Sequence, residues 1–177
     1  AIDAARAVQR ASLKATLKLT LCDLSDDVVD KKALYDLVRL AHTDKYLKRQ
    51  LRVLDEAEDE SVGPGSVMSA GHDECNDTLV THGTLQAVLS AIHVVKSGVD
   101  GVLGNRFANG FCCVRPPGHH VGRDGRTEDA PTQGFCFFNN VAIAAKYAVD
   151  SCGLQRVAVI DFDVHHGNGA RARSGVP

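Results

Sequence analysis

The chain has 177 residues, 44% of them hydrophobic and 24% charged, with a formal net charge of −2. This composition fits a soluble globular protein that can bury a core. The charge gives no electrostatic reason to bind nucleic acid or an anionic membrane, and no apolar run is long enough to predict a membrane span. Six cysteines without a C-x-x-C pair indicate reduced thiols and an intracellular protein.

Helical patterns fill the first third of the chain. Residues 1–21 are amphipathic and superficially like a transit peptide, but Asp3 and the missing initiator Met favour a docked helix, which is expected over residues 1–19. The pattern repeats over residues 27–40, and Thr43 is positioned to cap a third helix. An acidic and Gly–Pro-containing stretch over 55–66 predicts a solvated loop.

The later part of the chain predicts a parallel crossover unit. The expected elements are a helix over 81–96 ending near Gly98, a strand over 111–115, a polar loop over 121–133, an Ala-rich helix over 140–152 and a buried strand over 156–162. A strand, a helix and a strand within about 50 residues are typical of parallel strands joined by a crossover. Polar groups that follow the two strands would then meet at one edge of the sheet.

Alternating ligand-type residues mark the segment that follows the second expected strand. In an extended chain Asp161, Asp163 and His165 project from one face. Carboxylate and imidazole together favour zinc or another first-row divalent ion. The absence of a nearby Cys ligand argues against a structural zinc knuckle. A magnesium or calcium site, or a capped helix start, is the alternative.

A histidine pair and an aromatic cluster lie between the two expected strands. The pair His119-His120 could be an ordinary loop pair, but the preceding Arg-Pro-Pro-Gly at a strand end favours a rigidly held site. Phe137 and Phe138 read equally well as core aromatics or site residues, whereas Phe135, directly after a glycine, favours a pocket lining. Earlier in the chain, His42 and Tyr46 are interpreted as packing residues rather than catalytic ones.

Three motifs in combination resemble the zinc-dependent histone deacetylase family. They are Arg115-Pro-Pro-Gly-His-His120, Gly134-Phe-Cys-Phe-Phe-Asn-Asn140 and Asp161-Phe-Asp-Val-His-His-Gly-Asn-Gly169. The segment Ala41-His-Thr-Asp-Lys-Tyr-Leu47 is similar to an upstream motif of that family, so the resemblance covers residues 39–169. Asn168, where class I members usually have Asp, and the long loop before Gly134 favour a class II-like, plant-type or protist-type lineage.

The resemblance implies an α/β fold, a three-layer sandwich with a central parallel sheet of the arginase/deacetylase type. The chain starts at Ala1, and residues 170–177 depart from the family pattern. The family's third zinc ligand, a downstream aspartate, and its transition-state tyrosine have no counterpart here. We therefore expect residues 1–177 to be a partial deacetylase domain with an incomplete C-terminal half, inactive as an isolated polypeptide.

Site roles follow from the resemblance, residue by residue. It implies that Asp163 and His165 are zinc ligands and that His119 and His120 are the tandem active-site histidines. His120 is the better candidate for the general base. The resemblance also implies a place for Asp161 beside His119.

Further residues receive supporting roles from the same resemblance. It implies a structural K⁺ ion at Asp161 and a place for Asn168 near His120. Gly134 and Phe135 would line the tunnel for the acyl-lysine. The residue that hydrogen-bonds the substrate backbone at the rim would be Asp77, with Asp73 as a competitor.

The implied function is zinc-dependent hydrolysis of acetyl-lysine in histones or other proteins. Chromatin regulation, transcription repression, corepressor partners and a nuclear or cytoplasmic location follow by resemblance alone. An acetylpolyamine amidohydrolase-like enzyme and a non-catalytic fragment are the alternatives. Asp77 would discriminate between the two enzymes, because a peptide backbone needs a rim carboxylate and a polyamine does not.

Overall fold

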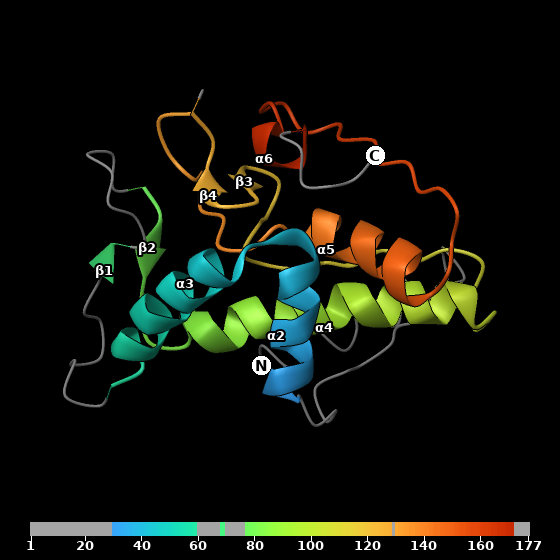
Figure 1. Ribbon diagram of the computed structural model, residues 1–177, viewed down its shortest axis with the longest axis horizontal. Helices are drawn as coiled ribbons and strands as arrows, with labels where there is room; N and C mark the ends of the chain where they lie inside the picture. The colour runs from blue at the N-terminus through green and yellow to red at the C-terminus, as the bar shows by residue number, and fades with distance from the viewer. Residues whose placement is uncertain (1–29, 60–67, 70–76, 129, 172–177) are drawn as a thin grey trace, which may run out of the picture.

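The computed structural model describes residues 30–59, 68–69, 77–128 and 130–171. Its helices are α2 (Lys31–Ala41), α3 (Asp44–Ala57), α4 (Thr84–Leu103), α5 (Asn140–Lys146), the π-helical turn η1 (Tyr147–Ser151) and α6 (Asn168–Arg171). Its strands are β1 (Met68–Ser69), β2 (Leu79–Val80), β3 (Val121–Gly122) and β4 (Gly125–Arg126). Figure 1 shows α2 crossing the long α4, with α5 lying along α4. The helix expected over 1–19 lies outside the described residues, as does Asp73.

The helices α2 and α3 begin at side-chain caps. The Asp30 carboxylate accepts the backbone N–H of Lys32 at 2.9 Å, and the Thr43 hydroxyl accepts that of Tyr46 at 3.3 Å. Each cap satisfies a backbone donor that the first helical turn leaves unpaired. The predicted cap at Thr43 is therefore confirmed. None of the described helices is long and apolar enough to cross a membrane.

The helix α4 continues past the glycine at which the sequence predicted its end. A Cβ at Gly98 would lie 2.8 Å from the Cys112 sulfur, and one at Gly101 would collide with the Phe107 ring. Glycine therefore occupies both positions because a neighbouring segment packs directly on the helix backbone, where no side chain fits, and it does not mark the end of the helix. The predicted helix end near Gly98 is therefore wrong, and α4 ends at Leu103.

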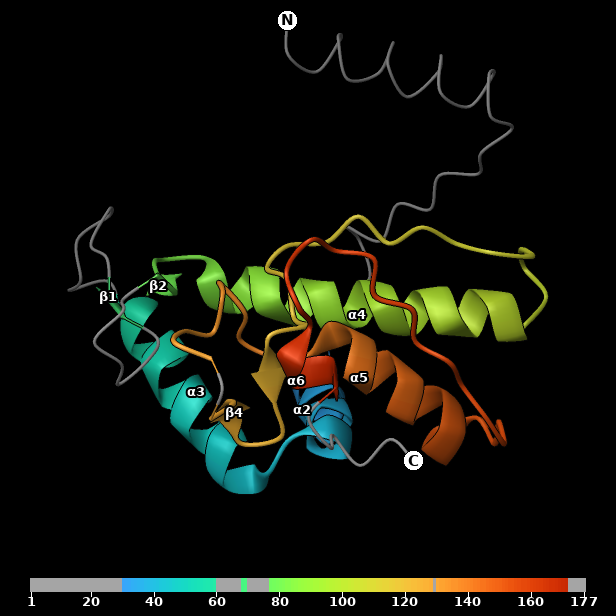
Figure 2. The ribbon, with the colours of Figure 1, turned by 90° about the horizontal axis from the view of Figure 1, so that it is seen from above.

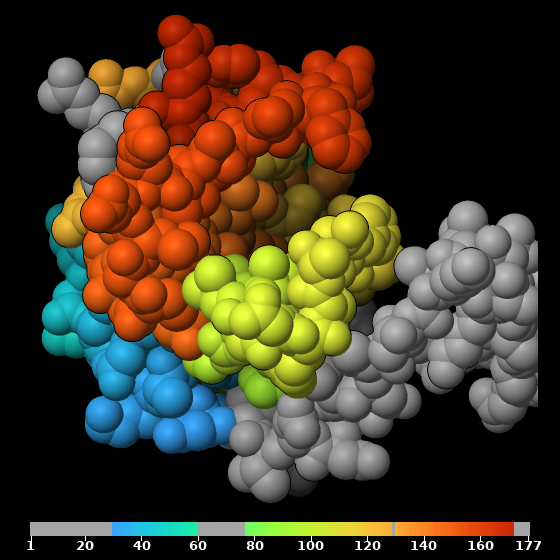
Figure 3. Space-filling model, turned by 90° about the vertical axis from the view of Figure 1, so that its right-hand side faces the viewer, coloured from blue at the N-terminus to red at the C-terminus, as the bar shows by residue number. Residues whose placement is uncertain are grey.

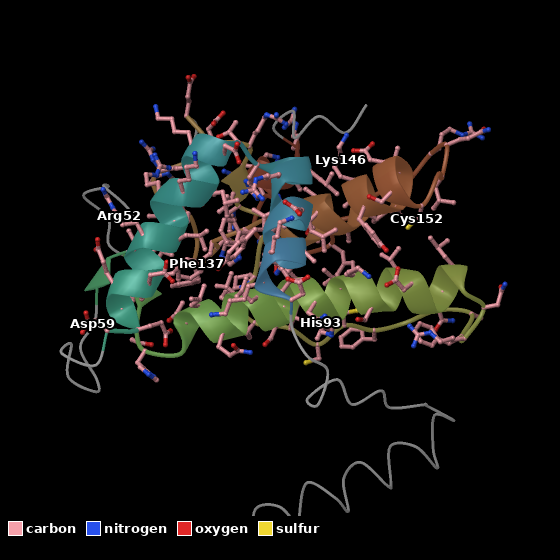
Figure 4. The ribbon with its side chains drawn as sticks, turned by 60° about the horizontal axis from the view of Figure 1, so that its bottom comes forward. Arg52, Asp59, His93, Phe137, Lys146 and Cys152 are labelled. Carbon is pink, nitrogen blue, oxygen red and sulfur yellow. The ribbon has the colours of Figure 1, made fainter. Side chains whose placement is uncertain are left out.

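Aromatic rings and one histidine form the centre of the core, between α2, α3 and α5. Phe137 and Phe138 are both buried, and Figure 4 shows Phe137 among the side chains between the helices. The Tyr46 hydroxyl donates to the Phe137 carbonyl oxygen at 2.7 Å. His42 is buried and accepts the Asn139 backbone N–H at 2.9 Å. The interpretation of His42 and Tyr46 as packing residues is confirmed.

The parallel crossover unit does not form within the described residues. Both sheets there are antiparallel pairs, β1 with β2 and β3 with β4, so the strands expected over 111–115 and 156–162 are wrong. Ile160 and Phe162 are 85% and 94% exposed, and Figure 3 shows the orange-to-red segment that contains them on the outside of the molecule. A parallel strand buries its apolar side chains only between neighbouring strands and covering helices. No described segment offers these residues such neighbours.

The polar loop expected over 121–133 contains the hairpin β3–β4. Gly122 pairs with Gly125 across a two-residue turn. Gly125 has φ +108°, and a Cβ there would lie 2.7 Å from the Tyr46 ring. Glycine is needed at this position for both reasons. The loop is therefore a folded element packed against α3.

Candidate active site

His119 and His120 lie in a turn that is pressed against the start of α5. A Cβ at the preceding Gly118 would lie 2.6 Å from the Phe138 carbonyl oxygen, so only glycine allows this approach. The Asn140 side chain donates to the Pro116 carbonyl oxygen at 3.1 Å and ties the turn to the helix. The two imidazole rings lie with their centroids 4.1 Å apart.

Asp161 holds His119. Its Oδ2 atom lies 2.8 Å from His119 Nδ1, and this hydrogen bond lowers the pKa of the Asp161 carboxyl below its ordinary value. A Cβ at Gly167 would collide with the same carboxylate oxygen. The chain turn after His165 can therefore approach the pair only because residue 167 is glycine.

Asn168 holds His120 from the first residue of α6. Its Oδ1 atom lies 2.7 Å from His120 Nδ1, and its amide nitrogen donates to the Thr127 hydroxyl. A Cβ at Gly169 would collide with the backbone at Val121, so α6 packs directly on the histidine turn. Figure 2 shows α6 close to the hairpin, which it contacts through β3.

Gly134 and Phe135 form a left-handed turn next to His120. Their φ angles are +52° and +65°, and a Cβ at Gly134 would collide with the His120 ring. Phe135 is 52% exposed, unlike the two buried phenylalanines that follow. A positive φ is uncommon for a residue other than glycine, and such residues cluster at active sites and ligand-binding sites.

A short hydrogen-bond chain connects the Phe135 turn to Asp77. The Phe135 backbone N–H donates to the Thr78 hydroxyl at 3.1 Å, and this hydroxyl donates to Asp77 Oδ1 at 2.9 Å. Two sequence-predicted residues therefore meet through Thr78, which the sequence did not single out.

Asp163 and His165 lie side by side at the surface. The Oδ1 atom of Asp163 is 3.1 Å from His165 Nδ1 and 2.7 Å from its backbone nitrogen. The backbone N–H keeps the pKa of Asp163 below its ordinary value. The rings of His165 and His120 have centroids 6.0 Å apart.

The donor atoms of this pair fit one divalent ion. Two donors at about 2.1 Å from a tetrahedral zinc ion are about 3.4 Å apart, close to the observed 3.1 Å. A third donor is missing, because the described residues contain no group of three or more His, Cys, Asp or Glu side chains that could hold a metal.

The arrangement places two oriented imidazoles next to a carboxylate–imidazole pair. Such a site can move a proton at one imidazole and contribute two ligands to a metal. Thr127, Gly167 and Gly169 complete it, and the sequence assigned them no role. Both glycines belong to the motif that spans residues 161–169, so that motif could have indicated them. Thr127 lies in a polar loop that has no recognisable sequence motif.

Comparisons with known proteins agree with the motifs. The histone deacetylase domain family matches residues 4–173. The chain is 54% identical over 99 residues to "Type-2 histone deacetylase 2" of Dictyostelium discoideum, covering 56% of the chain and 6% of that protein. It is 38% identical over 139 residues to "Histone deacetylase 10, chloroplastic" of rice, covering 76% and 28%. It is also 54% identical over 71 residues to "Polyamine deacetylase HDAC10" of mouse, covering 40% and 10%.

A solved structure shares the fold. The HDA15 HD domain matches with a TM-score of 0.59 and 27% sequence identity, covering 77% of this chain and 34% of that one. The chain thus spans a minor part of these relatives. The family match covers nearly all of its residues, and the chain belongs to the histone deacetylase family.

Proposed function

We propose that this chain forms part of a zinc-dependent lysine deacetylase, which hydrolyses the amide of acetyl-lysine in histones or other proteins. The observation that carries the proposal is the arrangement of the two histidines. His119 and His120 each use Nδ1 to contact a side-chain acceptor, and Asp163 and His165 lie beside them. By family resemblance the proposal extends to a nuclear or cytoplasmic location and to corepressor partners.

His120 would act as the general base. Its Nδ1 donates to Asn168 Oδ1, which leaves Nε2 as the nitrogen with a free lone pair. Such a nitrogen can take a proton from a water molecule that attacks the amide. His119, oriented by its contact with Asp161, would stabilise the negative charge that develops in the transition state.

Asp163 and His165 would hold the zinc ion. When bound, zinc supplies a Lewis acid that polarises the amide carbonyl and makes a water molecule more acidic. Catalytic zinc sites normally have three protein ligands, and the family supplies the third from a downstream aspartate. Zinc binding is therefore proposed for the full-length protein that contains this sequence. A monovalent cation at Asp161 stays a prediction.

An acetylated polyamine is the second candidate substrate. The relative named "Polyamine deacetylase HDAC10" is as similar over its aligned residues as the relative named histone deacetylase. Gly134 and the exposed Phe135 would line the path of the acyl chain for either substrate. Asp77 lies at the end of the hydrogen-bond chain from Phe135, where it could accept a backbone N–H of a peptide.

Turnover of two substrates by the full-length, zinc-loaded protein tests the proposal. We expect chelator-sensitive hydrolysis of an acetyl-lysine peptide. Asp77→Ala should lower kcat/KM for the peptide about 10-fold and leave that for N-acetylspermidine unchanged. Asp55→Ala, which removes an exposed carboxylate on α3, is the control. Hydrolysis of the polyamine alone would favour the second candidate, and hydrolysis of neither would refute both.

A further inference from the structure

The backbone of Phe135 has a conformation that residues other than glycine rarely adopt. Its φ of +65° follows the φ of +52° at Gly134, in a turn that lies against the His120 ring. Such a conformation persists only where the surrounding structure holds it. The direction of the half-exposed Phe135 ring therefore depends on the contacts that hold this turn.

Two threonine hydroxyls accept the backbone N–H groups of the turn. The Gly134 N–H donates to the Thr132 hydroxyl at 3.1 Å, a contact between residues two positions apart. The Phe135 N–H donates to the Thr78 hydroxyl at 3.1 Å, across 57 residues of the chain. The first contact shapes the turn locally. The contact with Thr78 ties the turn to a separate part of the fold.

Both hydrogen bonds of the Thr78 hydroxyl have a fixed direction. A backbone N–H can only donate, so the hydroxyl oxygen accepts from Phe135. The hydroxyl hydrogen donates to Asp77 Oδ1 at 2.9 Å, because a carboxylate can only accept. Thr78 is 4% exposed, so water cannot freely replace either partner. One buried group therefore connects the Phe135 turn with Asp77, and neither bond can reverse.

Thr78 itself is held by the core. It directly precedes β2, which pairs with β1, and Val80 of β2 is fully buried. Beyond the strand, the Gly83 N–H donates to Glu58 Oε1 at 2.8 Å, at the end of α3. The hydroxyl therefore has a fixed place from which it can orient the Phe135 turn.

We infer that Thr78 is a positioning residue for the substrate, which fixes the Asp77 carboxylate and the Phe135 ring relative to each other. The inference rests on the proposed function, in which these two residues contact the peptide backbone and the acyl chain. Thr78 thereby controls how tightly the substrate binds and leaves the proton transfer at His120 unchanged. The competing explanation is that Thr78 only stabilises the start of β2.

Substitutions at position 78 test the inference in the full-length, zinc-loaded protein. Thr78→Val keeps the shape of the side chain but removes the acceptor for Phe135 and the donor to Asp77, so the turn can relax toward a negative φ. We expect KM for an acetyl-lysine peptide to rise about 10-fold, with kcat within about 2-fold of the parent value. Thr78→Ser keeps the hydroxyl and should restore KM to within about 2-fold.

Thr43 provides a matched control, because its hydroxyl also accepts a backbone N–H and donates to an aspartate. Thr43→Val should lower the Tm and leave KM within about 2-fold. In an Asp77→Ala/Phe135→Ala background, Thr78→Val should change kcat/KM by less than about 2-fold, because the residues that it positions are gone. Equal losses in both backgrounds, or a comparable rise of KM in Thr43→Val, would overturn the inference.

Amide hydrogen exchange tests the contact without turnover. Measured by mass spectrometry at single-residue resolution, exchange of the Phe135 N–H should be slow in the parent protein and in Thr78→Ser. It should be at least about 10-fold faster in Thr78→Val, and in Thr78→Ala, which replaces Thr78→Val if that variant does not fold. Unchanged exchange would refute the inference whatever the substrate is, and faster exchange with an unchanged KM would leave Thr78 a purely structural role. Absence of turnover in the parent protein would refute the proposed function instead.

Discussion

The two halves of the site are held in different ways. His119 and His120 are fixed by side chains 42 and 48 residues away, and the backbones around them are packed so closely that only glycine fits. Asp163 and His165 contact each other across two residues, with side chains 50% and 74% exposed. The histidine half is therefore preorganised by the fold. The ligand half is held by local contacts, and metal binding would supply the order that packing does not.

Removal of a ligand should have the largest effect. In the full-length protein, His165→Ala should reduce bound zinc to a trace and turnover by at least about 10³-fold, because two ligands cannot hold a catalytic metal. Metal analysis and an acetyl-lysine assay measure both. His166→Ala removes the exposed neighbouring imidazole and should retain zinc. Full occupancy in His165→Ala would show that the ligand half is assigned wrongly.

Removal of the base should separate chemistry from metal binding. We expect His120→Ala to lose about 10²-fold or more in kcat and to keep its zinc, because the ring takes a proton but is not assigned as a ligand. Steady-state kinetics and metal analysis on one preparation provide the check. Near-normal turnover by this variant would exclude the role of His120 as the base.

Acid should weaken the core beneath the histidine half. Burial lowers the pKa of His42 from 6.5 to about 4, so the unfolded chain takes up this proton at a higher pH than the folded chain does. The stability from neutral His42 is complete above about pH 6.5 and falls as the pH drops toward 4, by on the order of 3 kcal/mol. Urea unfolding at several pH values measures the loss.

A matched pair of histidine variants isolates the contribution of His42. His42→Gln should flatten the dependence of the unfolding free energy on pH between about 6.5 and 4. His82→Gln, at an exposed position, should leave it as in the parent protein. The same slope in His42→Gln and in the parent protein would contradict the assignment.

The smallest effect is expected at the exposed aromatic residue. Phe135→Ala should raise KM for an acetyl-lysine peptide about 5-fold to 10-fold and cost less than about 1 kcal/mol of stability, because its ring is half exposed. The buried Phe138 is the control, and Phe138→Ala should cost about 3–5 kcal/mol. A comparable stability loss in Phe135→Ala would identify Phe135 as a core residue.

Local signals in the sequence predicted the helices well and the sheet poorly. The cap at Thr43 and the helix that starts at Asn140 depend on neighbouring residues, so a short window contains the information. The strand expected over 156–162 depends on partners elsewhere in the chain, and its apolar residues alone cannot indicate whether those partners are present. Gly98 shows that a helix end can be mispredicted for the same reason. A glycine is needed there because Cys112, which is distant in the sequence, packs against the helix backbone.

The residues of the candidate site also differ in whether a local sequence pattern could predict them. Alternating residue types brought Asp161, Asp163 and His165 together in the prediction, and the structure places Asp161 on His119. The link from Thr127 to Asn168 spans 41 residues and joins a polar loop to a helix end. No spacing or periodicity predicts such a contact, which depends on how the hairpin packs against α3.

The hydroxyl–amide contact between Thr127 and Asn168 has a consequence for how such sequences evolve. A hydroxyl can accept from the NH₂ group of an Asn and can donate to the carboxylate of an Asp, so Thr127 suits either residue at position 168. In an alignment of related chains, a hydroxyl residue at position 127 should therefore accompany both Asn and Asp at position 168. Exchange between Asn and Asp at position 168 would then need no change at position 127, whereas loss of the hydroxyl would leave a polar group of either residue without its partner.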